Sequence, residues 1–155
     1  MKTIVIYYSL FGNTRQVADA MAEALSANSS VKAVSIQEIS ADDLDGLDLV
    51  IMGCPTHVAT IPKEMRPLLE ALPRRCFKGT YAAVFDTSNK MSPLLKPFTA
   101  AKRLRGKMRS LGGRLLAKPE TFHVIGREGP MYDGEIERAD EWAAGILAAA
   151  GRKKN

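Results

Sequence analysis

The sequence predicts an α/β protein in which a doubly wound sheet of five parallel strands is covered by helices on both faces, giving three layers. Five apolar, strand-like runs alternate with five stretches of helical spacing along the 155 residues. Such alternation is typical of parallel sheets with helical crossovers. One run, LDLVIMG at residues 47–53, is apolar at nearly every position. A strand of this kind is expected to be buried on both faces.

The first three strands are expected at residues 3–8, 31–36 and 47–53. After the first strand, apolar residues recur at the i, i+4, i+8 spacing of a buried helix face, at Val17, Met21 and Leu25. Ser40, with Asp43 three residues later, resembles a capping box. This pair predicts a brief helix before the third strand.

The second half of the chain begins with a helix that can start at Pro62 and ends at Pro73. The fourth strand is expected at residues 80–85 and is followed by a loop at 86–96. A basic helix comes next and is ended by a glycine pair at residues 112–113.

The fifth strand is expected within residues 115–125, with an interruption near Pro119 because proline cannot donate to a sheet ladder. The last helix covers about residues 134–150. A single domain is therefore expected over residues 1–151, followed by a frayed basic tail at 152–155.

Composition excludes several classes of protein. Apolar residues make up 46% and charged residues 25% of the chain, as in ordinary globular proteins. No apolar stretch reaches the roughly 18 residues of a membrane-spanning helix, and no basic leader precedes an apolar segment, which favours a cytoplasmic protein. Two cysteines, Cys54 and Cys76, are too few for a disulfide framework, and with two histidines they offer no spacing for a metal site.

The net charge of +5 is unevenly distributed. Residues 1–62 carry 3 Lys/Arg against 7 Asp/Glu, whereas residues 63–155 carry 19 against 10. Residues 90–118 contain nine basic side chains and no acidic one. Such a surface favours an anionic partner, whether protein, nucleic acid or membrane. Only one aromatic residue occurs among these charges, which argues against single-stranded nucleic acid.

Three loops are candidates for a binding site, at residues 9–14, 54–61 and 86–92, because ligands of doubly wound sheets bind beyond the carboxyl ends of the strands. The first loop leads into a helix, whose N-terminus exposes unpaired N–H groups and a partial positive charge. Gly12 permits an unusual backbone angle, and hydroxyl and amide side chains surround it. The loop can therefore hold a phosphate without a lysine. Neither G-x-G-x-x-G nor a P-loop motif occurs there.

The segment YSLFGNT at residues 8–14 resembles the phosphate loop of the flavodoxin family, which often ends in Gly-Asn-Thr. Residues 53–56, Gly-Cys-Pro-Thr, resemble the second flavin loop of that family, and residues 128–143 resemble its last connection and helix. The resemblance spans essentially the whole chain and implies a short-chain flavodoxin-like fold with the strand order 2-1-3-4-5.

The resemblance also implies FMN as the cofactor. Its phosphate would bind residues 9–14, where Ser9, Asn13 and Thr14 supply hydroxyl and amide donors beside Leu10, Phe11 and Gly12. The isoalloxazine ring would lie between residues 55–59 and 86–91. The residues expected to bind it are Pro55, Thr56, His57, Val58, Asp86, Thr87, Ser88 and Met91.

The flavin loops of this chain lack the aromatic residues that often flank the ring in this family, so His57, Val58 or Met91 is expected to take their place. The resemblance implies a protein that passes electrons between redox partners, with no catalytic residues of its own. If the partner of the basic surface is a redox protein, its docking face is expected to be acidic. Two alternatives stay open: a small NAD(P)H- or quinone-linked FMN reductase, and a flavin-free binding module that acts through its basic face.

Overall fold

A parallel sheet forms the centre of the structure, a computed structural model that describes residues 1–27, 29–57, 60–90, 94 and 98–154. Its strands within these residues are β1 (Lys2–Tyr7), β2 (Ser30–Ser35), β3 (Leu49–Pro55), β4 (Tyr81–Asn89), β5 (Arg114–Leu115) and β6 (Glu120–Val124). They pair in the order β2-β1-β3-β4-β5, with β6 also paired to β4. The order and the parallel pairing confirm the predicted fold class.

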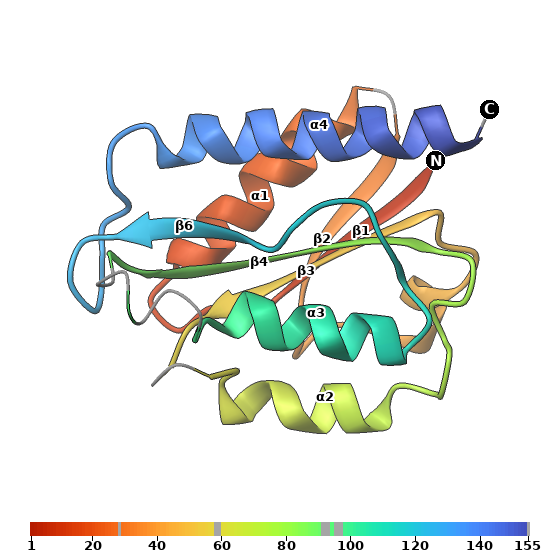
Figure 1. The fold of residues 1–155 in the computed structure, drawn as a ribbon, viewed down its shortest axis with the longest axis horizontal. Coiled ribbons are helices and arrows are strands. Elements are labelled where there is room, and N and C mark those ends of the chain that lie inside the picture. Colours follow the sequence, from red (N-terminus) through yellow and green to blue (C-terminus); the bar gives the residue numbers. More distant parts are fainter. Residues whose placement is uncertain (28, 58–59, 91–93, 95–97, 155) are drawn as a thin grey trace.

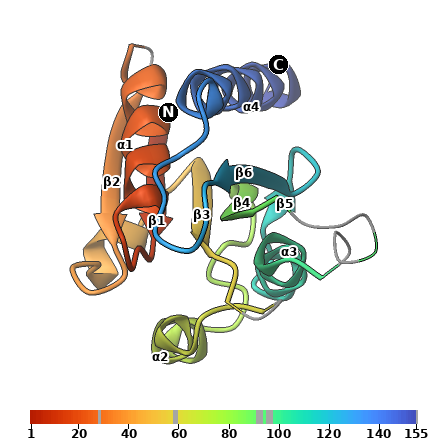
Figure 2. The same cartoon turned by 90° about the vertical axis from the view of Figure 1, so that its left-hand side faces the viewer.

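Helices cover both faces of the sheet. The longer helices α1 (Asn13–Ser26) and α4 (Glu135–Lys154) lie on one face, and α2 (Arg66–Ala71) and α3 (Ala100–Ser110) lie on the other (Figures 1 and 2). Two short 3₁₀ turns, η1 (Ala41–Leu44) and η2 (Lys63–Met65), connect these elements. The apolar face of each helix packs on the sheet, so the molecule has one hydrophobic core on each side of it.

The predicted helix faces are buried as their spacing indicates. Val17, Met21 and Leu25 of α1 are fully buried in the core that α1 shares with α4. Leu104 and Met108 of α3 are fully buried in the opposite core. Burial of this apolar stripe stabilises each helix more than its intrinsic propensity does.

The fifth strand is divided as Pro119 predicts. β5 pairs with the start of β4, at Tyr81 and Ala82, whereas β6 pairs with its end, from Phe85 to Asn89. The expected end of the fourth strand at residue 85 and the loop from residue 86 were wrong, because β6 provides backbone partners through Asn89. The side chains there are polar, so the apolar pattern stops before the strand does.

The brief helix predicted after Ser40 is the turn η1, and its capping box forms: the Asp43 carboxylate accepts the Ser40 N–H and hydroxyl at 2.9 Å. At the other end of the chain, α4 continues to Lys154, through most of the segment expected as a tail.

Candidate functional site

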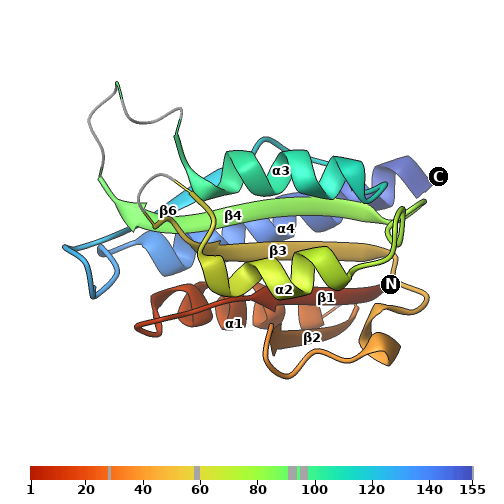
Figure 3. The same cartoon turned by 90° about the horizontal axis from the view of Figure 1, so that it is seen from below.

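A cavity of about 480 Å³ opens at the carboxyl ends of the strands, the end that lies on the left in Figure 3. Its walls are Phe11, Asn13, Thr14, Pro55, Thr56, His57, Thr87, Ser88, Asn89, Val124 and Arg127. The volume suits a small molecule or cofactor. The three loops predicted from the sequence therefore meet at one cavity.

Most of the expected site residues line this cavity or shape its edge. Ser9, Leu10 and Gly12 belong to the first loop without lining the cavity, and Val58 and Met91 lie outside the described residues. Asn89 falls within the predicted loop 86–92 but was not singled out there, and sequence reasoning missed two further lining residues, Val124 and Arg127. Val124 ends β6 and Arg127 lies in the connection after it, where no sequence pattern marks them.

Ser9 organises the first loop from its start. Its Oγ accepts the N–H of Gly12 at 3.1 Å and that of Arg15 at 3.3 Å. The side chain thus satisfies two donors near the start of α1, as an N-cap residue does. Its own hydroxyl proton remains available to a ligand.

Gly12 turns the chain into α1 with φ 93°, a left-handed conformation that favours glycine. A Cβ placed there would meet nothing within 4 Å, so the space in front of the turn is open. The neighbouring N–H groups of Leu10, Phe11, Asn13 and Thr14 donate to no acceptor in the described part of the chain. Unpaired donors at a helix N-terminus suit an oxyanion such as phosphate.

Asn13 links the first loop to a distant part of the chain. Its Nδ2 donates one hydrogen bond to the carbonyl of Glu128 at 2.8 Å. The Asn13 side chain comes so close to the backbone of residue 129 that only glycine fits there, because a Cβ at Gly129 would lie 2.4 Å from Asn13 Oδ1. The side chain therefore fixes the connection after β6 against the start of α1. Its second Nδ2 hydrogen and its backbone N–H remain available to a ligand in the cavity that Asn13 lines.

Thr14 and Thr87 join the first and third loops. Their hydroxyl oxygens lie 2.7 Å apart in a buried contact. Each hydroxyl can donate one hydrogen bond, so after one donates to the other, one proton is left for a ligand in the cavity.

Asp86, which the sequence predicts beside the flavin, is not among the residues that line the cavity. The side chain is fully buried on the α3 side of the sheet. Its Oδ2 accepts the Thr56 hydroxyl at 2.8 Å and the Ala101 N–H at 2.9 Å, while Thr56 Oγ1 accepts the Ala100 N–H at 3.0 Å. Asp86 and Thr56 together cap α3, so Asp86 is a positioning residue that fixes the second loop.

Burial raises the pKa of the Asp86 carboxyl above its usual value, and the hydrogen bonds from Ala101 and Thr56 only partly offset this. An acid with a raised pKa binds its proton more tightly in the folded state, so its contribution to stability falls as pH rises above the unfolded pKa.

Asp86→Asn is neutral at every pH and lacks this dependence. We expect the stability advantage of the wild-type protein over Asp86→Asn to be largest near about pH 4 and to shrink toward about pH 8. Urea unfolding across this range measures the difference. Asp42→Asn, at an exposed aspartate of η1, is the matched control. A wild-type advantage that grows with pH would contradict the assignment.

Cys54 lies on β3, directly opposite Asp86 on β4. It is fully buried, and burial together with the charge of Asp86 raises the pKa of its thiol well above the usual value. The thiol thus stays protonated and serves as a small packing residue.

Phe11 gives the cavity a wall with a phenyl ring, which the lining residues of the second and third loops lack. Its side chain remains 43% exposed, and the Arg127 guanidinium carbon lies 5.8 Å from its ring centroid. The sequence placed Phe11 only in the phosphate loop. An exposed ring beside a cavity can stack on a flat ligand.

No helix within the described ranges is long and apolar enough to cross a membrane.

Comparison with known proteins gives consistent results. The family model described as Flavodoxin matches residues 5–142. The flavodoxin of Clostridium saccharobutylicum is 27% identical over 153 residues, covering 95% of this chain and 92% of that protein. The flavodoxin of Maridesulfovibrio salexigens is 26% identical over 152 residues, covering 94% and 96%.

Among solved structures, oxidised Flavodoxin 2 from Bacillus cereus superimposes with a TM-score of 0.79 at 20% identity, over 96% of this chain and 99% of that one. This likeness confirms the fold. Because the family model spans most of the chain, the protein belongs to the flavodoxin family.

Proposed function

We propose that this protein binds FMN in the cavity at the carboxyl ends of the strands and carries electrons between partner proteins. The unpaired N–H groups of residues 10, 11, 13 and 14, beside the open turn at Gly12, are the observation that carries the proposal. Family membership and the names of the full-length relatives support it.

The described residues suit the parts of FMN. The loop of residues 9–14 would hold the phosphate through its N–H groups, with hydroxyl donors from Ser9 and the Thr14–Thr87 pair. The ring would lie between residues 55–57 and 87–89, beside Phe11. When bound, FMN supplies one- or two-electron transfer, and the protein's part is to hold it and to set its potential.

The proposal includes a partner with an acidic docking surface. Lys102, Arg103 and Arg109 of α3 are exposed, and α3 carries no acidic residue. Such a face attracts an oppositely charged partner and speeds its association. Electron transfer to that partner is then expected to slow as ionic strength rises.

A titration of the purified protein with FMN tests the proposal, followed by flavin absorbance and fluorescence. We expect saturable binding that weakens about tenfold in Thr14→Val, because the Thr14 hydroxyl is lost and the Thr87 hydroxyl loses the partner that positions it. Thr3→Val is the matched control: the Thr3 hydroxyl is buried on β1 with no hydrogen-bond partner among the described residues and lies outside the cavity. Absence of binding at high FMN concentration would refute the proposal.

A further inference from the structure

A second cavity, of about 570 Å³, lies at the outer edge of the sheet where the end of β4, β6 and the start of α3 meet. Its walls are Ser88, Asn89, Lys90, Thr99, Lys102, Pro119, Glu120, Thr121, His123 and Arg138. Only Ser88 and Asn89 also line the first cavity. The two cavities therefore share one short wall and are otherwise built from different residues.

The walls of the second cavity carry an excess of positive charge from three elements. Lys90 follows β4, Lys102 belongs to α3 and Arg138 to α4. The Lys90 ammonium lies 4.1 Å from the centroid of the Tyr132 ring, a cation–π contact that holds it beside β6. Lys102 forms no ion pair with any described residue.

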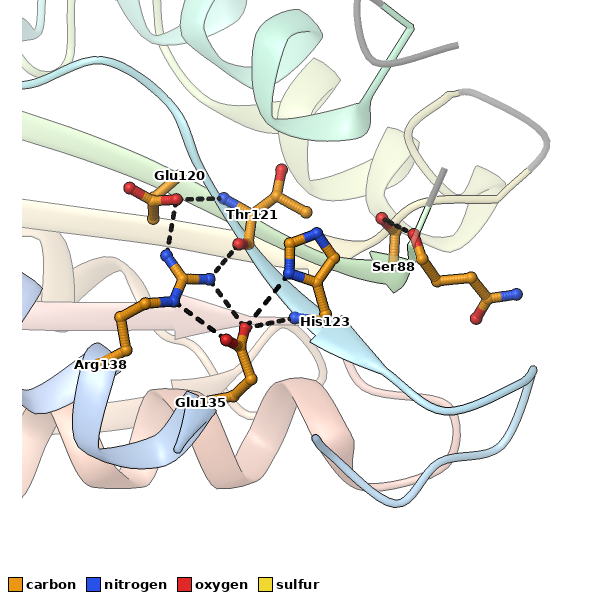
Figure 4. A network of polar contacts seen from close by, with 7 residues as sticks. Ser88, Glu120, Thr121, His123, Glu135 and Arg138 are labelled. Carbon is orange, nitrogen blue, oxygen red and sulfur yellow. Dashed lines mark hydrogen bonds and ion pairs between the residues drawn. The ribbon is translucent and has the colours of Figure 1, made fainter. Parts of the chain in front are cut away.

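Glu120 is the one carboxylate of the lining, and it is already paired with Arg138 at 2.8 Å. Arg138 also bonds Glu135 at 2.8 Å and the carbonyl of Thr121 (Figure 4). This network fixes the guanidinium and neutralises Glu120. The charges left to meet a ligand are therefore those of the two lysines.

His123 is held by the same network. Glu135 accepts its backbone N–H at 2.6 Å and lies 3.5 Å from its Nδ1. Burial raises the pKa of Glu135, but the hydrogen bonds from Arg138 and His123 outweigh it and lower the pKa overall, so Glu135 stays ionised. The other ring nitrogen of His123 points away from Glu135 (Figure 4) and adds a polar group to a cavity that His123 lines.

We propose that this cavity binds a small organic anion, one whose carboxylate or phosphate group pairs with Lys102 and Lys90. Small oxyanions are bound through charge-assisted hydrogen bonds of this kind. The volume exceeds what a lone oxyanion fills and lies in the range of small-molecule sites. The Pro119 ring and the threonine methyl groups offer contacts to the organic part. This site does not depend on FMN binding.

Titration of the ¹⁵N-labelled protein with benzoate, phenyl phosphate and benzamide, followed by NMR, tests the proposal. Benzoate and phenyl phosphate carry the two oxyanions on one aromatic body, and benzamide is the neutral analogue. We expect at least one anion to shift the amide signals of Lys102, Thr121 and His123 saturably, and benzamide to bind at least about tenfold more weakly. Equal binding of benzamide, or no saturable shift, would overturn the proposal.

The variant Lys102→Gln is expected to weaken anion binding about tenfold. Lys107→Gln removes the same charge from the same helix but lies outside the cavity, so it is expected to leave the affinity unchanged. An equal loss of affinity in both variants would mean that the anion is attracted to the basic helix in general. That result would overturn the proposal of a specific site in the cavity.

Repeating the titration with FMN present separates the two cavities. If FMN binds, anion affinity that changes by less than about threefold supports a distinct site. Anion binding that FMN abolishes would place the anion in the first cavity and refute the second site. If FMN itself does not bind, the anion titration still decides the proposal, since it uses the protein alone.

Discussion

Riboflavin, which is FMN without its phosphate, is expected to bind about 10³-fold more weakly than FMN. The loop of residues 9–14 holds four N–H groups, those of Leu10, Phe11, Asn13 and Thr14, that donate to no acceptor among the described residues, and the Ser9 hydroxyl belongs to the same loop. Hydrogen bonds to a charged group contribute about 1.5–3 kcal/mol each, and two of them account for a loss of this size. Without the phosphate, these donors have no charged partner.

Parallel fluorescence titrations with the two flavins measure this ratio. The ring and the ribityl chain are the same in both, so contacts at residues 55–57 and 87–89 cancel in the comparison. Inorganic phosphate is expected to compete with FMN but not with riboflavin. Affinities for the two flavins within about threefold of each other would mean that the loop does not hold the phosphate.

Gly53→Ala is expected to lower the free energy of unfolding by about 3 kcal/mol, because overpacking a filled core is destabilising. A Cβ at Gly53 would lie 2.2–2.4 Å from three atoms of the Phe85 ring. That ring is fully buried and packs edge-to-face on Phe122, with centroids 6.0 Å apart. Making room for the Cβ therefore requires the buried Phe85 ring or its neighbours to shift.

Urea unfolding of the variant gives this free energy directly. Gly106→Ala is the matched control, since Gly106 lies in α3 and a Cβ there meets nothing within 4 Å. The same substitution is expected to stabilise the protein there by up to about 1 kcal/mol, through higher helix propensity. A Gly53→Ala variant as stable as the wild type would show that the strands or the Phe85 ring move apart at little cost.

Much of the fold can be predicted from the spacing of apolar residues and from the positions of proline and glycine. The apolar run at residues 47–53 and the spacing of Val17, Met21 and Leu25 report which face of an element is buried, because that information is local. Pro119 likewise marks the division between β5 and β6, since proline removes one donor from the ladder. The polar turn of residues 9–14 is recognisable for the same reason: the donors and the glycine are consecutive in sequence.

The contacts that the sequence does not predict involve partners from distant parts of the chain. Asp86 follows an apolar strand and was expected at the ligand, yet the pleat of β4 turns it toward α3, where Ala101 and Thr56 meet it. Asn13 is predicted to donate to a phosphate, but nothing in the sequence indicates that its amide also donates to the Glu128 carbonyl, 115 residues away in sequence. Neither contact can be predicted from neighbouring residues in the sequence, because each depends on which connection packs against that strand or helix end.

The sequence by itself determined the alternation of strands and helices, their buried faces and the turn that can hold an oxyanion. Each of these features depends on residues that lie close together in the sequence. The tertiary structure decided the extension of β4 to Asn89, the place of Arg127 beside Phe11, and the second cavity walled by Lys90, Lys102 and Arg138. The physical reason is that crossovers and long-range strand pairing bring these residues together, and no residue carries a local signal of the neighbours it will gain on folding.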